Sequence, residues 1–252
     1  MDIVFVTGTA GSGKSYLTEA LKSWYLGKGE DVIAVNLDPG AMTLPYEPDV
    51  DIRQSIDLQG IMEDYTLGPN GALILAADMV ATRLAKIQEE VDSCKAEYVV
   101  VDTPGQIELF AFRESGEYIV KEMKADSKIL LFLLDPLLAN TPVNFLSLAL
   151  LSASVGLRMS IPRITVLTKR DIAKDEVKRI MEWSKRATVF EDALGYTKDS
   201  EQYSLYSEIF RSLRRLSFGA DPYPVSSLTQ EGIIALAGEM ARLSKGGEEL
   251  TD

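Results

Sequence analysis

The feature that most constrains this chain is the segment GTAGSGKS at residues 8–15, which comes just after the apolar run IVFV at residues 3–6. The segment has the pattern G-x-x-x-x-G-K-[ST], whose glycines let successive backbone N–H groups point at phosphate oxygens. The apolar run before it and the amphipathic stretch 16–26 after it are the context that this motif requires, and an ordinary glycine-rich turn is the alternative. The sequence therefore predicts a strand, a phosphate-binding loop and a helix, and it makes a nucleotide triphosphate the first ligand to consider.

The loop and the first helical turn supply the expected phosphate contacts. These residues are Gly11, Ser12, Gly13, Lys14, Ser15 and Tyr16. Lys14 adds a positive charge beside the phosphates, and the hydroxyl of Ser15 can ligate Mg²⁺. A helix that starts near Gly13 also directs the positive end of its dipole toward the anion.

Length and charge limit what else the chain can be. With 252 residues, 46% of them hydrophobic and 25% charged, it can bury a full core, and we expect a single domain over residues 1–252. Its formal net charge of −12 disfavours direct nucleic-acid binding, which needs cations to neutralise phosphates. The first strand begins at residue 2 and the only cysteine is Cys94, so we expect no signal peptide, no internal disulfide and a cytoplasmic location.

Histidine is absent from the whole sequence. Its absence excludes a mechanism with an imidazole base and a zinc site built from His and several Cys ligands. Nucleotide hydrolases that load metals onto other enzymes usually carry Cys and His clusters, so a metal-insertion role is disfavoured as well. Any hydrolysis must depend on positioning and charge stabilisation, which phosphoryl transfer permits.

Strand and helix patterns alternate along the chain. Runs of Val, Ile and Leu joined by helical segments predict an α/β P-loop fold, with an open, mostly parallel sheet and helices on both faces. Helical spacing predicts insertions around 55–93, including one helix over 72–91, and around 174–218, and it predicts a helix over 107–123. The most apolar region, 129–157, is interrupted by polar and proline residues, so it is interpreted as a buried strand and a buried helix without membrane contact.

Polar residues follow another buried strand, at Asp102-Thr103-Pro104-Gly105. Ligands of open α/β sheets bind at the carboxyl edge, where such residues gather. We expect Asp102 to hold Mg²⁺ through a water, together with Ser15, and the backbone N–H of Gly105 to contact the γ-phosphate. A plain strand-to-turn junction, in which Asp, Pro and Gly are common, is the alternative.

The segment Thr168-Lys169-Arg170-Asp171 bears on which base is bound. Guanine presents N1–H and its 2-amino group side by side, so the carboxylate of Asp171 can accept from both while the aliphatic stem of Lys169 lies on the ring. Adenine has no such pair of donors. The segment is similar to the N-K-x-D element of GTPases, with Thr168 in place of Asn, and the shorter side chain is expected to brace the loop less. An exposed charged turn is the alternative.

Ser226 and Ser227 end a later strand, where GTPases have a loop whose backbone N–H reaches guanine O6; a plain turn explains them equally well.

The phosphate loop, residues 102–105, residues 168–171 and the serine loop follow one another in the order found in GTPases. Three segments narrow the family: Asn36-Leu37-Asp38-Pro39, Gly68-Pro69-Asn70 and residues 102–108 resemble, in that order, the signature segments of the GPN-loop GTPases. The resemblance covers essentially the whole chain and is that of an archaeal-like member.

This resemblance implies a P-loop fold of the SIMIBI-type class, in which two protomers face each other across their nucleotides. In that family the Gly-Pro-Asn loop of one subunit reaches into the active site of the other, which places Gly68, Pro69 and Asn70 at the partner's nucleotide, with Asn70 near the γ-phosphate. From the residues alone, the tripeptide is more simply a turn whose Asn70 caps the following helix. The two roles are compatible, because a capping residue lies at a rigid helix start.

Candidate hydrolytic residues follow the glycine that is expected to contact the γ-phosphate. We assign Gln106 to orienting the attacking water and Glu108 to holding that water or its network, as the resemblance implies for these positions. Asp38, at the end of the second strand, can approach the same water or the metal shell. The alternative for Gln106 and Glu108 is a polar first turn of a helix. Arg113 is a less favoured charge donor on the same segment.

These residues together predict a Mg²⁺-dependent GTPase that hydrolyses GTP to GDP and phosphate as a homodimeric nucleotide-dependent switch. A nucleotide-gated binding module or assembly factor, in which hydrolysis is incidental, is the second hypothesis. The resemblance implies a protein client such as RNA polymerase assembly machinery. A small-molecule kinase is the third hypothesis, and the segment 102–106 disfavours it.

Overall fold

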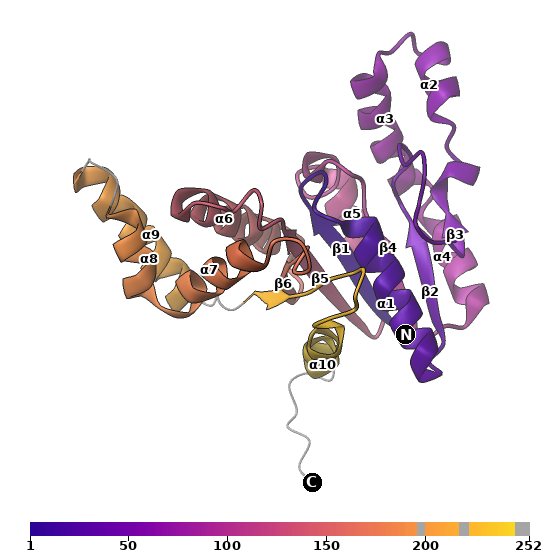
Figure 1. Ribbon diagram of the computed structural model, residues 1–252. Helices are drawn as coiled ribbons and strands as arrows, with labels where there is room; N and C mark the ends of the chain where they lie inside the picture. The colour runs from indigo at the N-terminus through magenta and orange to yellow at the C-terminus, as the bar shows by residue number, and fades with distance from the viewer. Residues whose placement is uncertain (196–199, 217–221, 245–252) are drawn as a thin grey trace.

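The computed structural model describes residues 1–195, 200–216 and 222–244, and its centre is a seven-stranded sheet (Figure 1). Every strand pair among these residues is parallel, and the strand order is β3-β2-β4-β1-β5-β6-β7. The strands are β1 (Asp2–Gly8), β2 (Val32–Asn36), β3 (Val50–Asp51), β4 (Tyr98–Asp102), β5 (Ser127–Leu134), β6 (Arg163–Leu167) and β7 (Tyr223–Pro224). The predicted α/β fold with a parallel sheet is confirmed.

Helices cover both faces of the sheet, because successive residues of each strand point to opposite sides. In β1, Val4 and Val6 pack with helices α1 (Lys14–Lys28) and α10 (Ile233–Ser244) on one face. Ile3 and Phe5 belong to a larger core on the other face. That core is covered by α2 (Leu58–Asp64), α3 (Pro69–Thr82), α4 (Leu84–Cys94), α5 (Glu114–Glu122), α6 (Pro142–Met159), α7 (Lys174–Lys185), α8 (Ala187–Leu194) and α9 (Ser200–Arg215).

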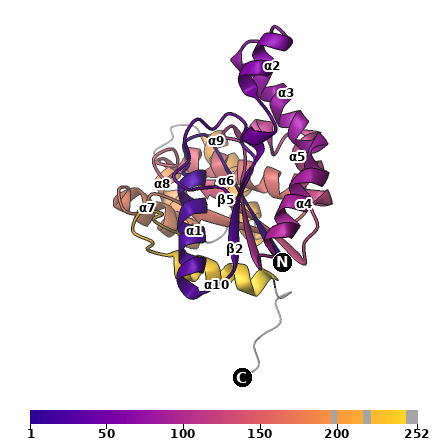
Figure 2. The same ribbon diagram turned by 90° about the vertical axis from the view of Figure 1, so that its right-hand side faces the viewer.

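Two groups of helices occupy the predicted insertion ranges. In both views the hairpin of α2 and α3 extends beyond the sheet edge at which β1 ends (Figures 1 and 2). The expected helix over 72–91 is two helices, α3 and α4, which meet at Arg83. The second group consists of α7, α8 and α9, where the rings of Phe190 and Phe210 stack with centroids 3.9 Å apart. Residues 196–199 and 217–218 of this range lie outside the described residues.

The predicted helix over 107–123 is wrong in its first half. Residues 107–109 form a single 3-10 turn, η2 (Ile107–Leu109), and α5 begins only at Glu114. The backbone packs tightly against itself here, since a Cβ added to Gly116 would lie 1.9 Å from the carbonyl oxygen of Phe110. The apolar residues that suggested a helical face are buried by this tight connection instead; the ring of Phe110 stacks on Phe5 of β1.

Helix α6 has the length and apolar composition of a membrane span. It has 18 residues with a mean hydropathy of 1.3, and it is the only such helix in the part of the chain that the structure describes. Buried core helices share these properties, and α6 packs against β5, α5, α8 and α9. The interpretation of 129–157 as a strand followed by a helix is confirmed by β5 and α6.

Candidate nucleotide site

The phosphate loop takes the backbone path that its glycines permit. It connects the end of β1 to α1, which begins at Lys14. Gly11 and Gly13 have φ values of 73° and 95°, in the left-handed region that other L-residues rarely adopt. These conformations leave the N-terminus of a 15-residue helix facing the loop, where its free N–H groups and dipole favour an anion.

Two adjoining cavities lie beside this loop and share Gly13 and Tyr16. The first, which we call the phosphate cavity, has a volume of about 420 Å³. It is lined by Gly11, Gly13, Lys14, Ser15, Tyr16, Asp38, Thr43, Leu44, Pro45, Thr103 and Gly105. The second, which we call the base cavity, has a volume of about 290 Å³ and is lined by Gly13, Tyr16, Thr168, Lys169, Asp171, Ile172, Ser227 and Leu228.

Lys14 is buried in the phosphate cavity and is held by three backbone carbonyls. Its Nζ donates to the oxygens of Gly8 and Thr9, at 3.2 and 3.1 Å, and to that of Gly105 at 2.8 Å. Burial lowers the pKa of Lys14, and the negative charges of Asp102 and Asp38 oppose this shift. The side chain therefore connects the phosphate loop to the segment after β4.

Asp38 connects the same segment to the loop after β2. Its Oδ2 accepts a hydrogen bond from the backbone N–H of Gly105 at 2.8 Å, and its Oδ1 accepts from the N–H of Gly40 at 2.9 Å. The Gly105 N–H is the group expected to contact a γ-phosphate. In this conformation it is already bonded to a carboxylate, so a γ-phosphate must replace Asp38 as its acceptor.

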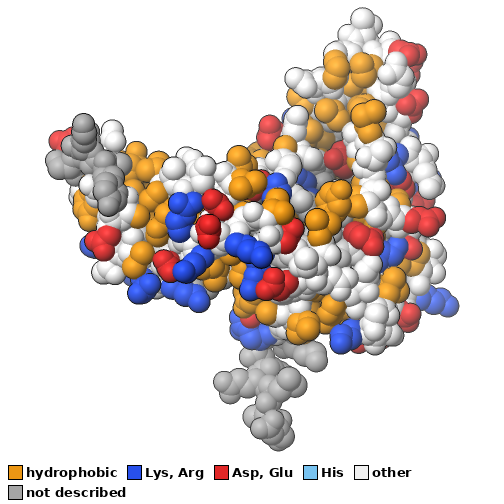
Figure 3. All heavy atoms as spheres, viewed as in Figure 1, with side chains coloured by type: hydrophobic (Ala, Val, Ile, Leu, Met, Phe, Trp, Pro, Cys, Tyr) orange, Lys and Arg blue, Asp and Glu red, His pale blue; other side chains and the backbone are white. Residues whose placement is uncertain are grey.

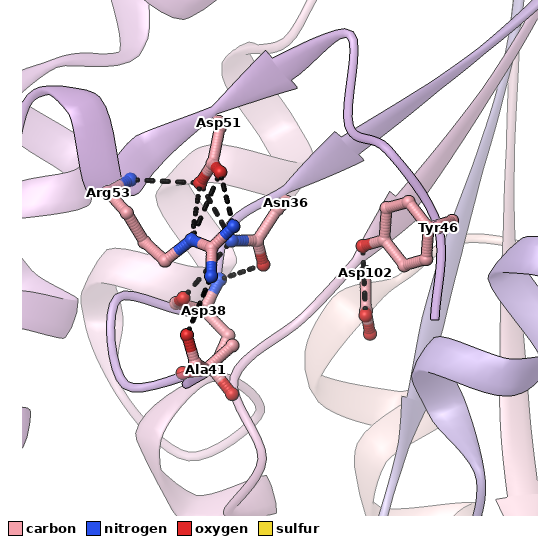
Figure 4. A network of polar contacts seen from close by, with 7 residues as sticks. All are labelled: Asn36, Asp38, Ala41, Tyr46, Asp51, Arg53 and Asp102. Atoms are coloured by element: carbon pink, nitrogen blue, oxygen red, sulfur yellow. Dashed lines mark hydrogen bonds and ion pairs between the residues drawn. The ribbon is translucent and has the colours of Figure 1, made fainter. Parts of the chain in front are cut away.

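A network behind Asp38 fixes this loop (Figure 4). The side chain of Asn36 accepts from the N–H of Asp38 at 3.0 Å and donates to Asp51 at 2.9 Å. Arg53 donates to both oxygens of Asp51 and to the carbonyl of Ala41. Burial acts to raise the pKa of Asp51, but hydrogen bonds from Arg53 and Asn36 outweigh it and lower that pKa. No sequence motif marks Asp51 or Arg53, since only the pairing of strands β2 and β3 brings them close to Asn36.

Asp102 is buried at the end of β4, beside the phosphate loop. Its Oδ2 accepts from the hydroxyl of Tyr46 at 3.0 Å, whereas its Oδ1 has no hydrogen-bond partner. Burial raises the pKa of Asp102 to about 6, opposed by hydrogen bonding from Ser15 and Tyr46 and by the charge of Lys14. Tyr46 was missed in the sequence, where the loop-like composition of residues 41–50 gave no sign of a buried hydroxyl.

The donor set at Asp102 fits a magnesium ion. Asp102 has one buried oxygen without a hydrogen-bond partner and interacts with the Ser15 hydroxyl, and both side chains offer hard oxygen donors. The described residues contain no cluster of three or more His, Cys, Asp or Glu that would complete a metal site from protein alone. Mg²⁺ usually keeps several waters and binds through one or two protein oxygens plus substrate phosphates, so the two donors of Ser15 and Asp102 are enough for it.

Thr168 braces the base cavity despite its short side chain. Its hydroxyl is buried and lies 2.9 Å from the carbonyl oxygen of Ser12 in the phosphate loop and 3.1 Å from that of Leu134 at the end of β5. These contacts join three segments of the chain that are far apart in sequence. The expectation that Thr in place of Asn weakens the bracing finds no support in these distances.

Lys169 and Asp171, the two residues expected to contact guanine, both line the base cavity. The Nζ of Lys169 lies 2.7 Å from Oδ2 of Asp135, a buried residue directly after β5. Ser227 also lines the cavity, whereas Ser226 lies beneath it, fully buried, and its hydroxyl oxygen accepts from the N–H of Thr229 at 3.1 Å. Of the two predicted serines, one therefore faces the cavity and the other supports its loop.

Comparison with known proteins agrees with this geometry. A family described as "Conserved hypothetical ATP binding protein" matches residues 6–244. GPN-loop GTPase 1 of Dictyostelium discoideum is 32% identical over 76% of this chain and 48% of its own length, and GPN-loop GTPase 1 of Saccharomyces cerevisiae is 28% identical over 92% and 63%. A crystal structure of a GTPase in apo form from Pyrococcus abyssi superposes with a TM-score of 0.84, at 28% identity over 96% of this chain and 97% of that one.

This chain belongs to the GPN-loop GTPase family. It spans only about half to just under two thirds of the length of the two curated relatives named above. The archaeal structure, in contrast, has nearly the same extent as this chain.

The GPN loop lies at the start of α3, at the end of the α2–α3 hairpin. Gly68 is the N-cap residue and Pro69 the first residue of the helix, and the cap has no side-chain hydrogen bond. The alternative that Asn70 caps this helix is therefore wrong. Asn70 is exposed and is not among the residues lining either cavity of its own chain.

Gln106 and Glu108 also lie outside both cavities. Both side chains are exposed, on the N-cap and the middle of η2. Of the four predicted hydrolytic residues, only Asp38 lines the phosphate cavity. The structure thus brings most of the predicted phosphate-loop and base-binding residues to two adjoining cavities of one chain, and it leaves Asn70, Gln106 and Glu108 on the surface.

Arg113 connects the GPN helix to the segment that carries these residues. Its Nε lies 2.8 Å from Oδ1 of Asp78 on α3, and the hydroxyl of Ser115 donates to the same oxygen at 2.9 Å. Hydrogen bonding from Arg113 lowers the pKa of Asp78. Arg113 is thus already paired with a carboxylate, which disfavours it as a charge donor to a phosphate in this conformation.

Proposed function

We propose that this protein is a Mg²⁺-dependent GTPase that hydrolyses GTP to GDP and phosphate and acts as a homodimeric, nucleotide-dependent switch. The observation that carries the proposal is the continuity of the two cavities. The phosphate loop, with Lys14, lines one cavity, and Lys169 and Asp171 line the other, with Gly13 and Tyr16 shared between them. A nucleotide laid across Gly13 would have its phosphates at the loop and its base at Asp171.

The choice of guanine over adenine follows from Asp171. The description of the matching family names ATP, whereas the named relatives are GTPases. No other described residue forms an ion pair or a side-chain hydrogen bond with the Asp171 carboxylate, so both its oxygens remain available as acceptors. Guanine offers two adjacent N–H donors to such a carboxylate, whereas adenine places an acceptor nitrogen against it. GTP is therefore the substrate that this cavity favours.

Ser15 and Asp102 are the residues that would hold Mg²⁺, which supplies charge neutralisation at the phosphates when bound. Lys14 would move its Nζ from the carbonyl of Gly105 to a phosphate oxygen. Asp38 would release the Gly105 N–H, which would then donate to the γ-phosphate. The freed Asp38 carboxylate would stand beside the γ-phosphate, where it can accept a hydrogen bond from the attacking water.

The homodimer is proposed because three of the four predicted hydrolytic residues, Asn70, Gln106 and Glu108, do not line the phosphate cavity of their own chain. Figure 3 shows apolar side chains gathered over the α2–α3 hairpin. Two of its large apolar residues, Tyr65 and Ile74, are 59% and 41% exposed. A second copy that covers this hairpin would bury them and could receive Asn70 at its own γ-phosphate, as the family resemblance implies.

The first experiment measures hydrolysis of GTP and ATP together with molecular mass, for wild type and Asn70→Ala, under one set of Mg²⁺ conditions. We expect GTP-selective turnover by a dimer and about 100-fold slower turnover in Asn70→Ala, the loss typical of one missing transition-state hydrogen-bond donor. GDP binding should be unchanged. Equal turnover of both nucleotides would refute the guanine assignment, and full activity of a monomer would refute the shared site.

A nucleotide-gated binding module, in which hydrolysis is incidental, is the second candidate. The contact between Asp38 and Gly105 favours it, because a γ-phosphate that replaces this contact would shift two loops whether or not hydrolysis follows. A client such as RNA polymerase assembly machinery in the cytoplasm is the partner that the resemblance implies. Capture of purified polymerase subunits with a nonhydrolysable GTP analogue but not with GDP, combined with negligible turnover, would favour the module over the enzyme.

A further inference from the structure

We propose that Asp135 is a positioning residue for base recognition, which holds the ammonium group of Lys169 away from Asp171 and so keeps the Asp171 carboxylate free to bind guanine. The inference rests on the proposed guanine-nucleotide binding and assigns a role to a residue outside the phosphate loop and the Thr168–Asp171 segment. The proposal is based on the contact between Asp135, at the end of β5, and Lys169, in the loop after β6.

Asp135 is built into the fold. Its side chain is only 8% exposed, and both of its oxygens have partners. Oδ1 accepts from the backbone N–H of Leu137 at 3.0 Å, which fixes the carboxylate in a turn after β5, and Oδ2 lies 2.7 Å from Nζ of Lys169. A buried carboxylate with a fixed orientation is a strong anchor for a lysine ammonium, because the carboxylate itself loses little further freedom when the charge-assisted hydrogen bond forms.

Lys169 has an unusual backbone. Its φ is +56°, in the left-handed region that residues with a Cβ rarely adopt, and its carbonyl accepts from the N–H groups of Ile172 and Ala173 at 3.1 and 3.0 Å. This tight turn brings Lys169 and Asp171, only two positions apart, to the same cavity. An ammonium group on a four-carbon stem can reach a carboxylate that close unless another acceptor holds it.

The carboxylates of Asp135 and Asp171 differ in whether they have a cationic partner. Asp135 is paired with Lys169, whereas no other described residue forms an ion pair or a side-chain hydrogen bond with the Asp171 carboxylate. If Lys169 turned to Asp171, its ammonium would occupy an acceptor that the guanine donors need and would neutralise the charge that strengthens those bonds. Asp135 therefore contributes to specificity without contact to the nucleotide.

The test measures dissociation constants for GDP and ADP in wild type, Asp135→Asn, Lys169→Met and the double variant. Asp135→Asn keeps the shape and the acceptor for Leu137 but loses the charge that holds Lys169. We expect its GDP affinity to fall about ten-fold, the effect of weakening one charge-assisted hydrogen bond, while weak ADP binding stays the same.

The double variant separates positioning from mere support of the fold. Without the Lys169 ammonium, this group can no longer neutralise Asp171, so Asp135→Asn/Lys169→Met should bind GDP more tightly than Asp135→Asn alone. A structural role predicts the opposite, with the double variant no better than either single one. Asp192→Asn, an exposed carboxylate on α8 that lines neither cavity, is the matched control and should bind like wild type.

Two results would overturn the proposal: an unchanged GDP-to-ADP ratio in Asp135→Asn, or no recovery in the double variant. If Asp135→Asn fails to fold, Asp135→Glu, which keeps the charge, serves instead and should retain most of the selectivity. Loss of selectivity there, with normal thermal unfolding, would also overturn the proposal, since a carboxylate that still holds Lys169 would not preserve base recognition. Wild-type protein that does not prefer GDP to ADP would refute the guanine assignment itself, independently of Asp135.

Discussion

The base cavity and the phosphate cavity differ in how complete they are within one chain. Four of the predicted residues line the base cavity, namely Thr168, Lys169, Asp171 and Ser227. Two of them also contact the surrounding fold: Thr168 contacts the phosphate loop, and Lys169 pairs with Asp135. On the hydrolytic side, the predicted residues Asn70, Gln106 and Glu108 are exposed and lie outside the phosphate cavity.

The contrast indicates that recognition and turnover have different structural requirements. The proposed base recognition uses short loops at the ends of β5 and β6 and before α10, which the sheet holds side by side. The predicted hydrolytic residues Gln106, Glu108 and Asn70 lie at η2 and at the start of α3, and they do not line the phosphate cavity. In the proposed function, one chain therefore holds the nucleotide by itself, whereas hydrolysis requires movement of these segments, a second copy, or both.

The largest expected effect concerns the base cavity. Asp171→Asn replaces one acceptor oxygen with an NH₂ donor, which clashes with a guanine donor but matches the C2 carbonyl of xanthine. We expect the ratio of GTP to xanthosine triphosphate affinity to change by roughly 10,000-fold, as in sites built to hydrogen-bond one analogue and not the other. Competition binding with a fluorescent nucleotide measures this ratio. A ratio equal to wild type would show that Asp171 does not read the base.

The next effect tests whether the hydrolytic side is completed by a second chain. Asn70→Ala and Gln106→Ala should each slow GTP turnover by about 100-fold as homodimers. Mixing the two proteins should restore part of the activity, because in a mixed dimer one of the two sites receives an intact Asn70 and an intact Gln106. Steady-state phosphate release is measured after heterodimers are isolated through two affinity tags. Isolated mixed dimers as inactive as the parent variants would contradict assembly in trans.

A smaller effect concerns the contact between Asp38 and Gly105. Because the Asp38 carboxylate accepts the N–H that a γ-phosphate needs, Asp38→Ala should raise the affinity for a nonhydrolysable GTP analogue by up to about ten-fold, with GDP affinity unchanged. Turnover should fall, since the same carboxylate is proposed to contact the attacking water. Calorimetric titration with both nucleotides separates the two effects. Equal changes for both nucleotides would mean that Asp38 shapes the loop without competing with the γ-phosphate.

Much of the binding site was predictable because its motifs are contiguous in sequence. The phosphate loop has the positive φ values that its glycines suggest, and the four residues 168–171 form one short loop after β6. The predicted helix over 107–123 failed for a tertiary reason: apolar residues there are buried by a tight turn against Gly116, and helical periodicity cannot distinguish that burial from an amphipathic face.

The sequence by itself determined the P-loop fold, the phosphate loop and the family, because each depends on local spacing or on segments that can be recognised one at a time. Only the tertiary structure decided which polar groups pair. Tyr46 with Asp102, Asp38 with Gly105 and Asp135 with Lys169 are 56, 67 and 34 residues apart. Parallel strands bring these partners to one edge of the sheet, and partial burial then makes an unpaired polar group costly, so partners must be found across the fold and not along the chain.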